Sequence, residues 1–484
     1  MAAPSESPVS ILPWGQWLLR LGAPLSAVLF LLLFHWRGLD CWFFQDDFGW
    51  LHLGLYPSHE TILQMLFSPK AHGNIRPWSE NLFFFAFYRL FGMNPLPFRI
   101  AVFVTASANV LLLFTLVRAL TGSVLASLGA AIFWLANPAL TPIFCWTCIY
   151  NETQYLFFVL LALLLFIRGK YWMQLGVFVL GLGSLETMVM YPVAATLYAW
   201  LYDRTKLRRT LPLYLISTAY TAAHFLVAPA PTSGPYAIHL DRRIFSTLWT
   251  YVQMALGPER LAHFHWTWPA ALVTVGTMAM GLGVLAAMFA AGRAGLFGAG
   301  WFIAFLLPVL PLPDHIIDYF IAGPAIGLAI ILGAAMASRW RVPAMLFGAI
   351  YLAVAMPAAW DVMTWERNRS HVARDLVQGV VRYDQEHPGK TILVTGVDSE
   401  QFYAAFSDVP FDLYGMHDVF LAPGADRQIP DGGSLAPLYV LPPEKALPRL
   451  KADQAVVLDV SGGAIRDATV QFLSQYPADT AGPR

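Results

Sequence analysis

WLLRLGAPLSAVLFLLLFHW, residues 17–36, is a stretch of twenty residues whose one Asp, Glu, Lys or Arg is Arg20. An α-helix rises about 1.5 Å per residue, so a helix of this length can cross a hydrocarbon core of roughly 30 Å. No small-residue cleavage site follows the stretch. It therefore predicts a first transmembrane helix rather than a cleavable signal peptide.

Similar apolar runs continue along the chain and define its class. They predict an all-α polytopic membrane protein with eleven spans, at residues 17–36, 97–117, 123–143, 153–167, 172–185, 187–202, 210–228, 268–291, 295–312, 316–337 and 342–360. Residues 172–185 and 187–202 are predicted to form two spans with a break between them, rather than one long helix. Basic residues flank the pair at both ends, and an even number of crossings keeps these ends on one side.

The charge distribution divides the chain in two. Of the first 360 residues, 32 are Asp, Glu, Lys or Arg, against 28 of the last 124. Residues 1–360 are thus predicted to be a membrane domain and residues 361–484 a soluble domain. A helical pattern at 371–385 and buried strands at 391–397 and 455–460 indicate a small α/β fold there. The net charge is zero and no basic block occurs, which gives no support to nucleic-acid binding.

The positions of basic residues predict the orientation. With the N-terminus in the cytoplasm, the short outer loops 144–152, 186 and 313–315 contain no Lys or Arg, and the following residues lie inside: Arg20, Arg118, Arg168, Lys170, Arg204, Lys206, Arg208, Arg209, Arg293, Arg339 and Arg341. The long loops 37–96 and 229–267 and the C-terminal domain then face outward. We expect an inner (plasma) membrane protein that works on its extracytoplasmic face.

The segment CWFFQDDFGW, residues 41–50, places two adjacent carboxylates beyond the first span. Neighbouring negative charge and partial burial are expected to raise the pKa of Asp46 or Asp47, which suits a general base. The alternative is structural, because Asp commonly caps a helix and residues 48–55 are compatible with one.

Arg76 lies further along the same loop, before an apolar segment at 79–91 that predicts an interfacial helix. A guanidinium at headgroup level can bind a phosphate through two hydrogen bonds. Pairing with Glu80 is the alternative. Glu186, at the predicted hairpin tip, either lines a cavity and orients a substrate or simply meets water.

Several motifs together resemble the GT-C superfamily of membrane glycosyltransferases, within it the protein O-mannosyltransferase-like group and its bacterial relatives. They are the Asp46-Asp47 pair; Arg76-Pro77-Trp78 followed by YRLFGMNP at 88–95; Asn137-Pro138 with Trp146 and Tyr155-Leu156; Ser184-Leu185-Glu186 with Pro192; and Asp318-Tyr319-Phe320 with Pro324 and Gly327. They occur in the family's order. The sequence departs from the family at Leu185, where Lys is usual, and at Asp318, where Arg is usual.

The resemblance implies an inverting transfer of a sugar from a polyprenyl-phosphate donor to an acceptor hydroxyl on a glycan, lipid or protein. By carry-over, Asp46 is the leading general base and Asp47 its partner. Donor- or acceptor-binding candidates are Arg76, Tyr150, Asn151, Gln154, Glu186, His315 and Asp318. Tyr150, Asn151 and Gln154 are also compatible with an ordinary polar loop. No cofactor is expected; a divalent metal ion could bind the carboxylates, but the group is regarded as metal-independent.

Two other functions are compatible with the sequence. A flippase or transporter of lipid-linked sugar should show inverted repeats and ionisable residues near mid-bilayer, whereas the acidic residues here gather toward one face. A glycosyltransferase-like scaffold that binds glycolipid without turnover is the second alternative, because the Lys and Arg of two family motifs are missing.

Overall fold

The computed structural model describes residues 14–55, 61–256 and 269–475. The chain divides into two compact units. The first comprises Met1–Trp36, Phe103–Thr141 and Glu152–Trp360, and the second Arg37–Val102, Pro142–Asn151 and Asp361–Arg484. One of these divisions falls between Trp360 and Asp361, and the division into a membrane domain and a soluble domain stays a prediction. The loop 37–96, predicted as part of the membrane domain, clusters with the C-terminal residues.

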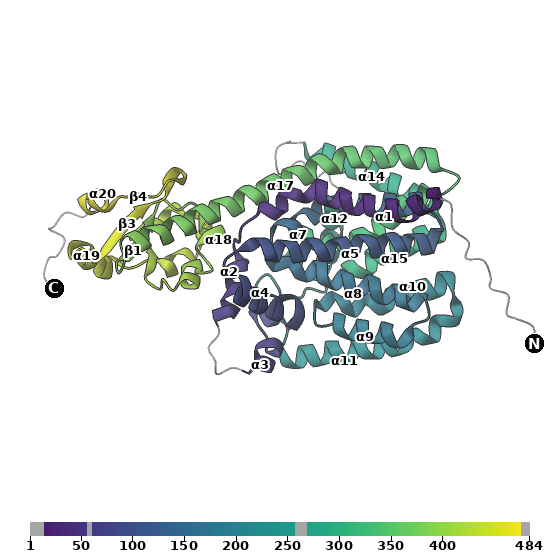
Figure 1. Ribbon diagram of the computed structural model, residues 1–484, viewed down its shortest axis with the longest axis horizontal. Coiled ribbons are helices and arrows are strands. Elements are labelled where there is room, and N and C mark those ends of the chain that lie inside the picture. Colours follow the sequence, from purple (N-terminus) through teal and green to yellow (C-terminus); the bar gives the residue numbers. More distant parts are fainter. Residues whose placement is uncertain (1–13, 56–60, 257–268, 476–484) are drawn as a thin grey trace, which may run out of the picture. The chain divides into compact units, whose positions relative to one another are not determined.

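The first unit is helical. Its helices are α1 (Trp14–His35), α6 (Val124–Leu135), α9 (Tyr171–Gly181), α10 (Tyr191–Tyr202), α11 (Leu211–Val227), α12 (Arg243–Leu256), α14 (Ala270–Ala291), α15 (Arg293–Leu306) and α16 (Pro324–Ala335). Helices with residues in both units are α5 (Pro95–Thr121), α7 (Thr141–Cys145), α8 (Tyr150–Ile167) and α17 (Arg341–Glu386). Helices α8, α9, α10 and α11 run nearly parallel or antiparallel to one another (Figure 1).

Every predicted span contains a helix, but the helices differ in length. Among the described residues, six are long and apolar enough to cross a membrane, and seven if the bent pair Val124–Leu135 and Pro138–Cys145 counts as one span. Tyr171–Gly181, Arg293–Val309 and Pro324–Ala335 are shorter apolar helices. The number eleven therefore stays a prediction. The break predicted at Glu186 is present, since the short helix η7 (Glu186–Met190) separates α9 from α10.

Helix α16 is the centre of the first unit. All twelve of its residues are buried, and it packs against α6, α14 and α15. A helix that is apolar on every side is stable only when it is surrounded, which explains this position. Glycines permit the closest approach: a Cβ on Gly327 would lie 2.2 Å from the carbonyl oxygen of Gly298 on α15.

The second unit contains the predicted α/β fold. Within the described part of the chain its sheet has four strands in the order β2-β1-β3-β4. They are β1 (Thr391–Thr395), β2 (Val419–Leu421), β3 (Ala455–Asp459) and β4 (Arg466–Asp467). β1 pairs in parallel with β2 and β3, with Leu393 opposite Val457, and β4 is antiparallel to β3 (Figure 1). Helices α19 (Pro443–Lys451) and α20 (Thr469–Ser474) pack on β3.

The long predicted loops contain short helices. Residues 37–96 hold α2 (Asp46–Leu51), η2 (His52–Leu55), α3 (Ile62–Phe67), the π-helix η4 (Pro77–Leu82) and α4 (Phe83–Phe91). The last two match the predicted interfacial helix at 79–91. Loop 229–267 holds α12, and its residues 257–267 lie outside the described part of the chain.

We expect Gly327→Ala to lower the free energy of unfolding by about 1–3 kcal/mol, because the added methyl group would overlap the α15 backbone. Gly176→Ala is the matched control, since nothing lies within 4 Å of a Cβ there and the site is helical. Thermal unfolding of the purified variants in detergent measures both. Equal midpoints for Gly327→Ala and the wild type would contradict this helix contact.

Candidate functional site

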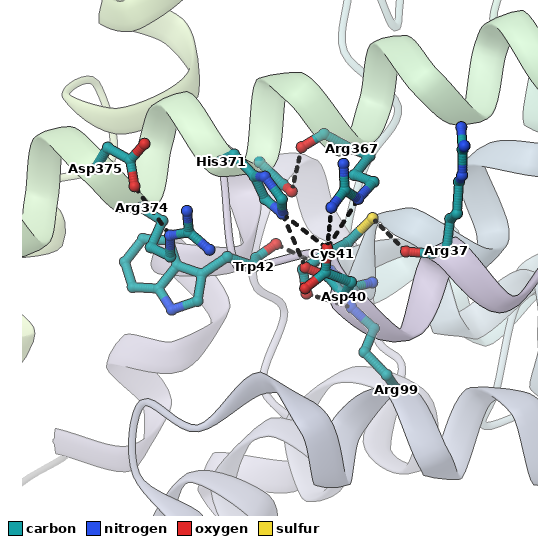
Figure 2. Close-up of polar contacts among 10 residues, drawn as sticks. Arg37, Asp40, Cys41, Trp42, Arg99, Arg367, His371, Arg374 and Asp375 are labelled. Carbon is teal, nitrogen blue, oxygen red and sulfur yellow. Dashed lines mark hydrogen bonds and ion pairs between the residues drawn. The ribbon is translucent and has the colours of Figure 1, made fainter. Parts of the chain in front are cut away.

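Contacts on both sides hold the backbone that leads to the Asp46-Asp47 pair. Arg367 Nε donates to Asp40 Oδ2 at 2.8 Å, and His371 Nε2 lies 3.3 Å from the same oxygen. The fully buried Arg99 donates to the carbonyl oxygens of Cys41, at 3.3 Å, and Trp42, at 3.0 Å. Figure 2 shows Arg367 and His371 pointing from α17 toward Asp40, with Arg99 reaching the same segment from another helix.

Gln45 turns the chain into helix α2. Its φ of 54° lies in the left-handed region, which costs energy for a residue other than glycine. Its N–H donates to the carbonyl of Ala404 at 2.8 Å, and its carbonyl accepts from Phe48 N–H at 3.0 Å. Backbone strain of this kind is concentrated at functional sites, where the surrounding structure holds it in place.

Asp47 is a structural carboxylate. It is fully buried, and its two oxygens accept from Cys148 N–H at 2.6 Å and from Phe44 N–H at 3.3 Å. Burial raises the pKa of Asp47 to about 7, while Arg99 and the two backbone hydrogen bonds oppose the rise. The carboxylate joins the segment before α2 to the segment before α8. The N-cap of α2 is Gln45, without a side-chain cap hydrogen bond, so Asp47 contacts the main chain in another way than the helix cap that the sequence allows.

Asp46 is placed differently. As the first residue of α2 it remains open to solvent on one side, although the surrounding chain shields much of its carboxyl group. This shielding, together with the negative charge of Asp408, raises the pKa of Asp46 to about 6, and Arg369 and hydrogen bonding from Gln45 counteract the rise. An accessible carboxylate with this pKa is suited to accept a proton near neutral pH.

Arg369 is a functional candidate that the sequence reasoning missed. It lies on α17 with its Cζ atom 5.4 Å from the ring centre of Phe44 and 5.1 Å from that of Trp365, and it forms an ion pair with Glu400. Its charge acts on Asp46. A signal was present: Arg367, Arg369 and Arg374 follow the last predicted span on the expected outer side, against the positive-inside trend.

Asp408 was also missed, and no local pattern marks it. It follows α18 (Ser399–Ala405), far along the chain from Asp46. Burial raises the pKa of Asp408, while the Ser407 hydroxyl and His52 lower it. The fold alone brings this second carboxylate to the site.

Arg76, Glu80 and Asn151 form a buried polar cluster. Arg76 Nη1 donates to Glu80 Oε1 at 2.6 Å, and Asn151 Nδ2 donates to the same oxygen at 2.8 Å. The pairing with Glu80 that the sequence left open is thus present. Tyr150 stacks on Phe83 with ring centres 4.2 Å apart. Three predicted binding residues, Arg76, Tyr150 and Asn151, therefore belong to the same unit as Asp46.

The other four predicted binding residues belong to the first unit. Gln154 Oε1 accepts a hydrogen bond from the Ser184 hydroxyl at 2.7 Å. Ser184 lies two residues before Glu186, the first residue of η7. The His315 ring packs against Tyr236 and Phe320, at 4.1 and 5.8 Å between ring centres. Asp318, largely buried, begins the short helix η10 (Asp318–Ile321) and accepts from the N–H of Tyr319 at 2.9 Å.

Among the residues that the structure describes, no group of three or more His, Cys, Asp or Glu side chains is arranged to hold a metal ion. Four carboxylates, Asp46, Asp47, Glu80 and Asp408, interact electrostatically with Cys148.

Comparison with known proteins gives a weak structural likeness. No protein-family model matches the chain, and no curated protein matches it. Among solved structures, the chain is similar to ArnT from Cupriavidus metallidurans bound to undecaprenyl phosphate, with 12% identity and a TM-score of 0.46 over 98% of this chain and 100% of that one. A TM-score below 0.5 at this identity does not establish a shared fold.

Asp47→Asn is expected to destabilise the protein by about 1–3 kcal/mol, because Phe44 and Cys148 donate to different carboxylate oxygens and an NH2 group of Asn would replace one of these acceptors. Asp46→Asn is the matched control and should not lower the stability, since its side chain is partly exposed and the change removes a negative charge whose ionisation the surroundings disfavour. Thermal unfolding in detergent measures the difference. Equal loss in both variants would show that Asp47 is no more structural than its neighbour.

The ionisation of Asp47 should contribute to the pH dependence of the free energy of unfolding. Its pKa is about 7 in the folded chain and about 3.9 in an unfolded one. Between these values the folded state binds more protons than the unfolded state, so its contribution to stability is present at low pH and is lost as pH rises through the folded pKa. We expect the wild-type midpoint temperature to fall across this window, and to fall less steeply in Asp47→Asn. Parallel profiles of midpoint temperature against pH in the wild type and Asp47→Asn would refute this prediction.

Proposed function

We propose that the chain is a membrane glycosyltransferase of the GT-C type. It transfers a sugar from a polyprenyl-phosphate donor to a hydroxyl of a glycan, lipid or protein acceptor on the extracytoplasmic face of the inner membrane. The proposal joins the ordered motifs of residues 46–327, which resemble the protein O-mannosyltransferase-like group, to the geometry around Asp46.

The observation that carries the proposal is that the two residues of the Asp pair differ in burial and in hydrogen bonding. Asp47 is buried and accepts two backbone N–H groups, whereas Asp46 keeps access to solvent and a pKa of about 6. A structural cap needs neither this access nor a pKa moved toward neutrality. Both properties are what a general base for a hydroxyl group requires.

The proposed reaction is a single displacement. Asp46 accepts the proton of the acceptor hydroxyl as its oxygen attacks the anomeric carbon of the sugar. The new carbon–oxygen bond forms while the bond to the donor phosphate breaks, and the polyprenyl phosphate leaves with the bonding electrons. The configuration at the anomeric carbon inverts, and the proton stays on Asp46 until water removes it.

The leaving phosphate needs positive charge or hydrogen-bond donors near it. Arg369 is the candidate whose charge acts on Asp46 itself, and its planar guanidinium suits a phosphate. The remaining donor- and acceptor-binding candidates are Arg76, Tyr150, Asn151, Gln154, Glu186, His315 and Asp318. Arg76 is held by its hydrogen bond to Glu80.

The experiment is a transfer assay joined to profiling of lipid-linked sugars and envelope glycans in cells that express equal amounts of the wild type, Asp46→Asn or Asp375→Asn. Asp375 is the matched control, because it is an exposed carboxylate of the same unit paired with neighbouring Arg374. We expect Asp46→Asn to lose transfer by a factor of about 10²–10⁴ and Asp375→Asn to retain it.

The two alternatives give other outcomes. If Asp46→Asn supports the full wild-type glycan profile, Asp46 is not the base. If, in addition, the wild-type protein moves lipid-linked sugar between leaflets of a vesicle without transferring it, the chain is a flippase. If deletion changes no glycan while purified protein retains glycolipid, it is a scaffold.

A further inference from the structure

The segment that follows α18 packs against helix α2 and brings a carboxylate with it. Helix α2 contacts η11 (Pro410–Tyr414), the short helix that ends this segment. The N–H of Gln45, the residue before α2, donates to the carbonyl of Ala404 at 2.8 Å. Both partners are main-chain atoms, so the contact does not depend on a side-chain rotamer.

Asp408 faces the side of α2 that carries Asp46. Its Oδ1 lies 3.6 Å from the position of a Cβ on Gly49. Residues 46 and 49 are three apart on the helix, and positions i and i+3 share a face. Glycine at position 49 has no side chain to fill this face of the helix, and the negative charge of Asp408 acts on Asp46.

The C-terminal domain fixes where Asp408 stands. The Ser407 hydroxyl donates to Asp408 Oδ2 at 3.1 Å, and Tyr439 donates to the Ser407 carbonyl. Val409 has a φ of 44°, in the left-handed region that a β-branched residue rarely adopts. The segment is thus held in a conformation it would not take by itself, which is typical of positions that orient a functional group.

The charged and titratable groups around the two carboxylates come from every adjoining element. Each basic neighbour of the two carboxylates also interacts with another carboxylate. Arg369 interacts electrostatically with Asp46 and forms an ion pair with Glu400. His52 interacts electrostatically with Asp408 and with Asp412. By element, these groups are Asp47 on α2, His52 on η2, Cys148 on the short helix η6 (Thr147–Ile149), Arg369 on α17, Glu400 on α18, Asp412 on η11 and Tyr439.

We propose that Asp408 is a positioning residue for Asp46, its negative charge favouring the protonated form of the Asp46 carboxyl group, so that the C-terminal domain completes the carboxylate site of the first loop. This inference rests on the proposed function in one respect only, namely that Asp46 is the general base. Two carboxylates that share a site cannot both ionise at their ordinary pH, which makes the accessible one a stronger base. The domain therefore acts within the site, beyond any recognition of the acceptor.

The test measures the protonation of Asp46 directly and needs no sugar substrate. Dicyclohexylcarbodiimide attaches to protonated carboxyl groups, and peptide mass spectrometry reports how much of Asp46 is modified. Full-length protein in detergent is labelled between about pH 4 and pH 8, a range that brackets the Asp46 pKa of about 6. The variants are Asp408→Asn, Asp408→Glu and the control Asp412→Asn, whose carboxylate contacts His417 on the same segment.

We expect half-modification of Asp46 near pH 6 in the wild type. In Asp408→Asn the midpoint should fall by roughly half a pH unit or more, while Asp408→Glu and Asp412→Asn keep it close to the wild-type value. Asn can still accept from Ser407, so the charge is the main loss. An unchanged midpoint in Asp408→Asn overturns the proposal, as does an equal fall in Asp412→Asn.

A reciprocal measurement covers the case in which Asp408→Asn folds poorly. Coupling between two protons acts equally in both directions, so Asp46→Asn should lower the labelling midpoint of Asp408 by the same amount. An Asp408 midpoint that does not move in Asp46→Asn likewise refutes the pair. Failure of the proposed function looks different, because the midpoints would shift as expected while no sugar transfer is detected.

Discussion

The buried carboxylate of Asp47 is the interaction on which the candidate site depends. Its two oxygens accept N–H groups from Phe44 and Cys148, residues about a hundred positions apart. These two hydrogen bonds hold the first loop against the segment before α8. A second contact lies beside them, because Asn151 at the start of α8 donates to Glu80, which also accepts from Arg76. A buried carboxylate is costly unless it is hydrogen-bonded or protonated, and the fold supplies the hydrogen bonds.

Adjacent residues on a helix point about 100° apart, and this geometry separates the two acids of one motif. Asp47 turns into the protein and Asp46 turns toward solvent and toward Arg369 and Asp408. Two neighbouring residues of one short sequence thus have different surroundings, one buried and hydrogen-bonded to the main chain and the other partly exposed. Gln45, with its φ of 54°, is the residue from which this helix begins.

The sequence predicted the elements whose cause is local. Apolar length located a helix in every expected span, charge density located the α/β domain, and parity located the break at Glu186. Strands β2 and β4 were not predicted because three and two residues are too short for a periodic signal. The roles of Asp46 and Asp47 could not be separated in advance, because burial depends on partners such as Cys148. Asp408 is near Asp46 through tertiary packing alone, which no local pattern encodes.

The hydrogen bond between Gln45 and Ala404 joins residues from opposite ends of the chain. A ribosome adds about 5–20 residues per second, so the first loop leaves it many seconds before Ala404 is made. During that interval the helices of the first unit can enter the bilayer while Gln45 lacks its backbone partner and Asp46 lacks its neighbour. A chain that stops before the C-terminal domain would lack both Ala404 and Asp408, so the contacts around Asp46 are complete only after that domain has been made.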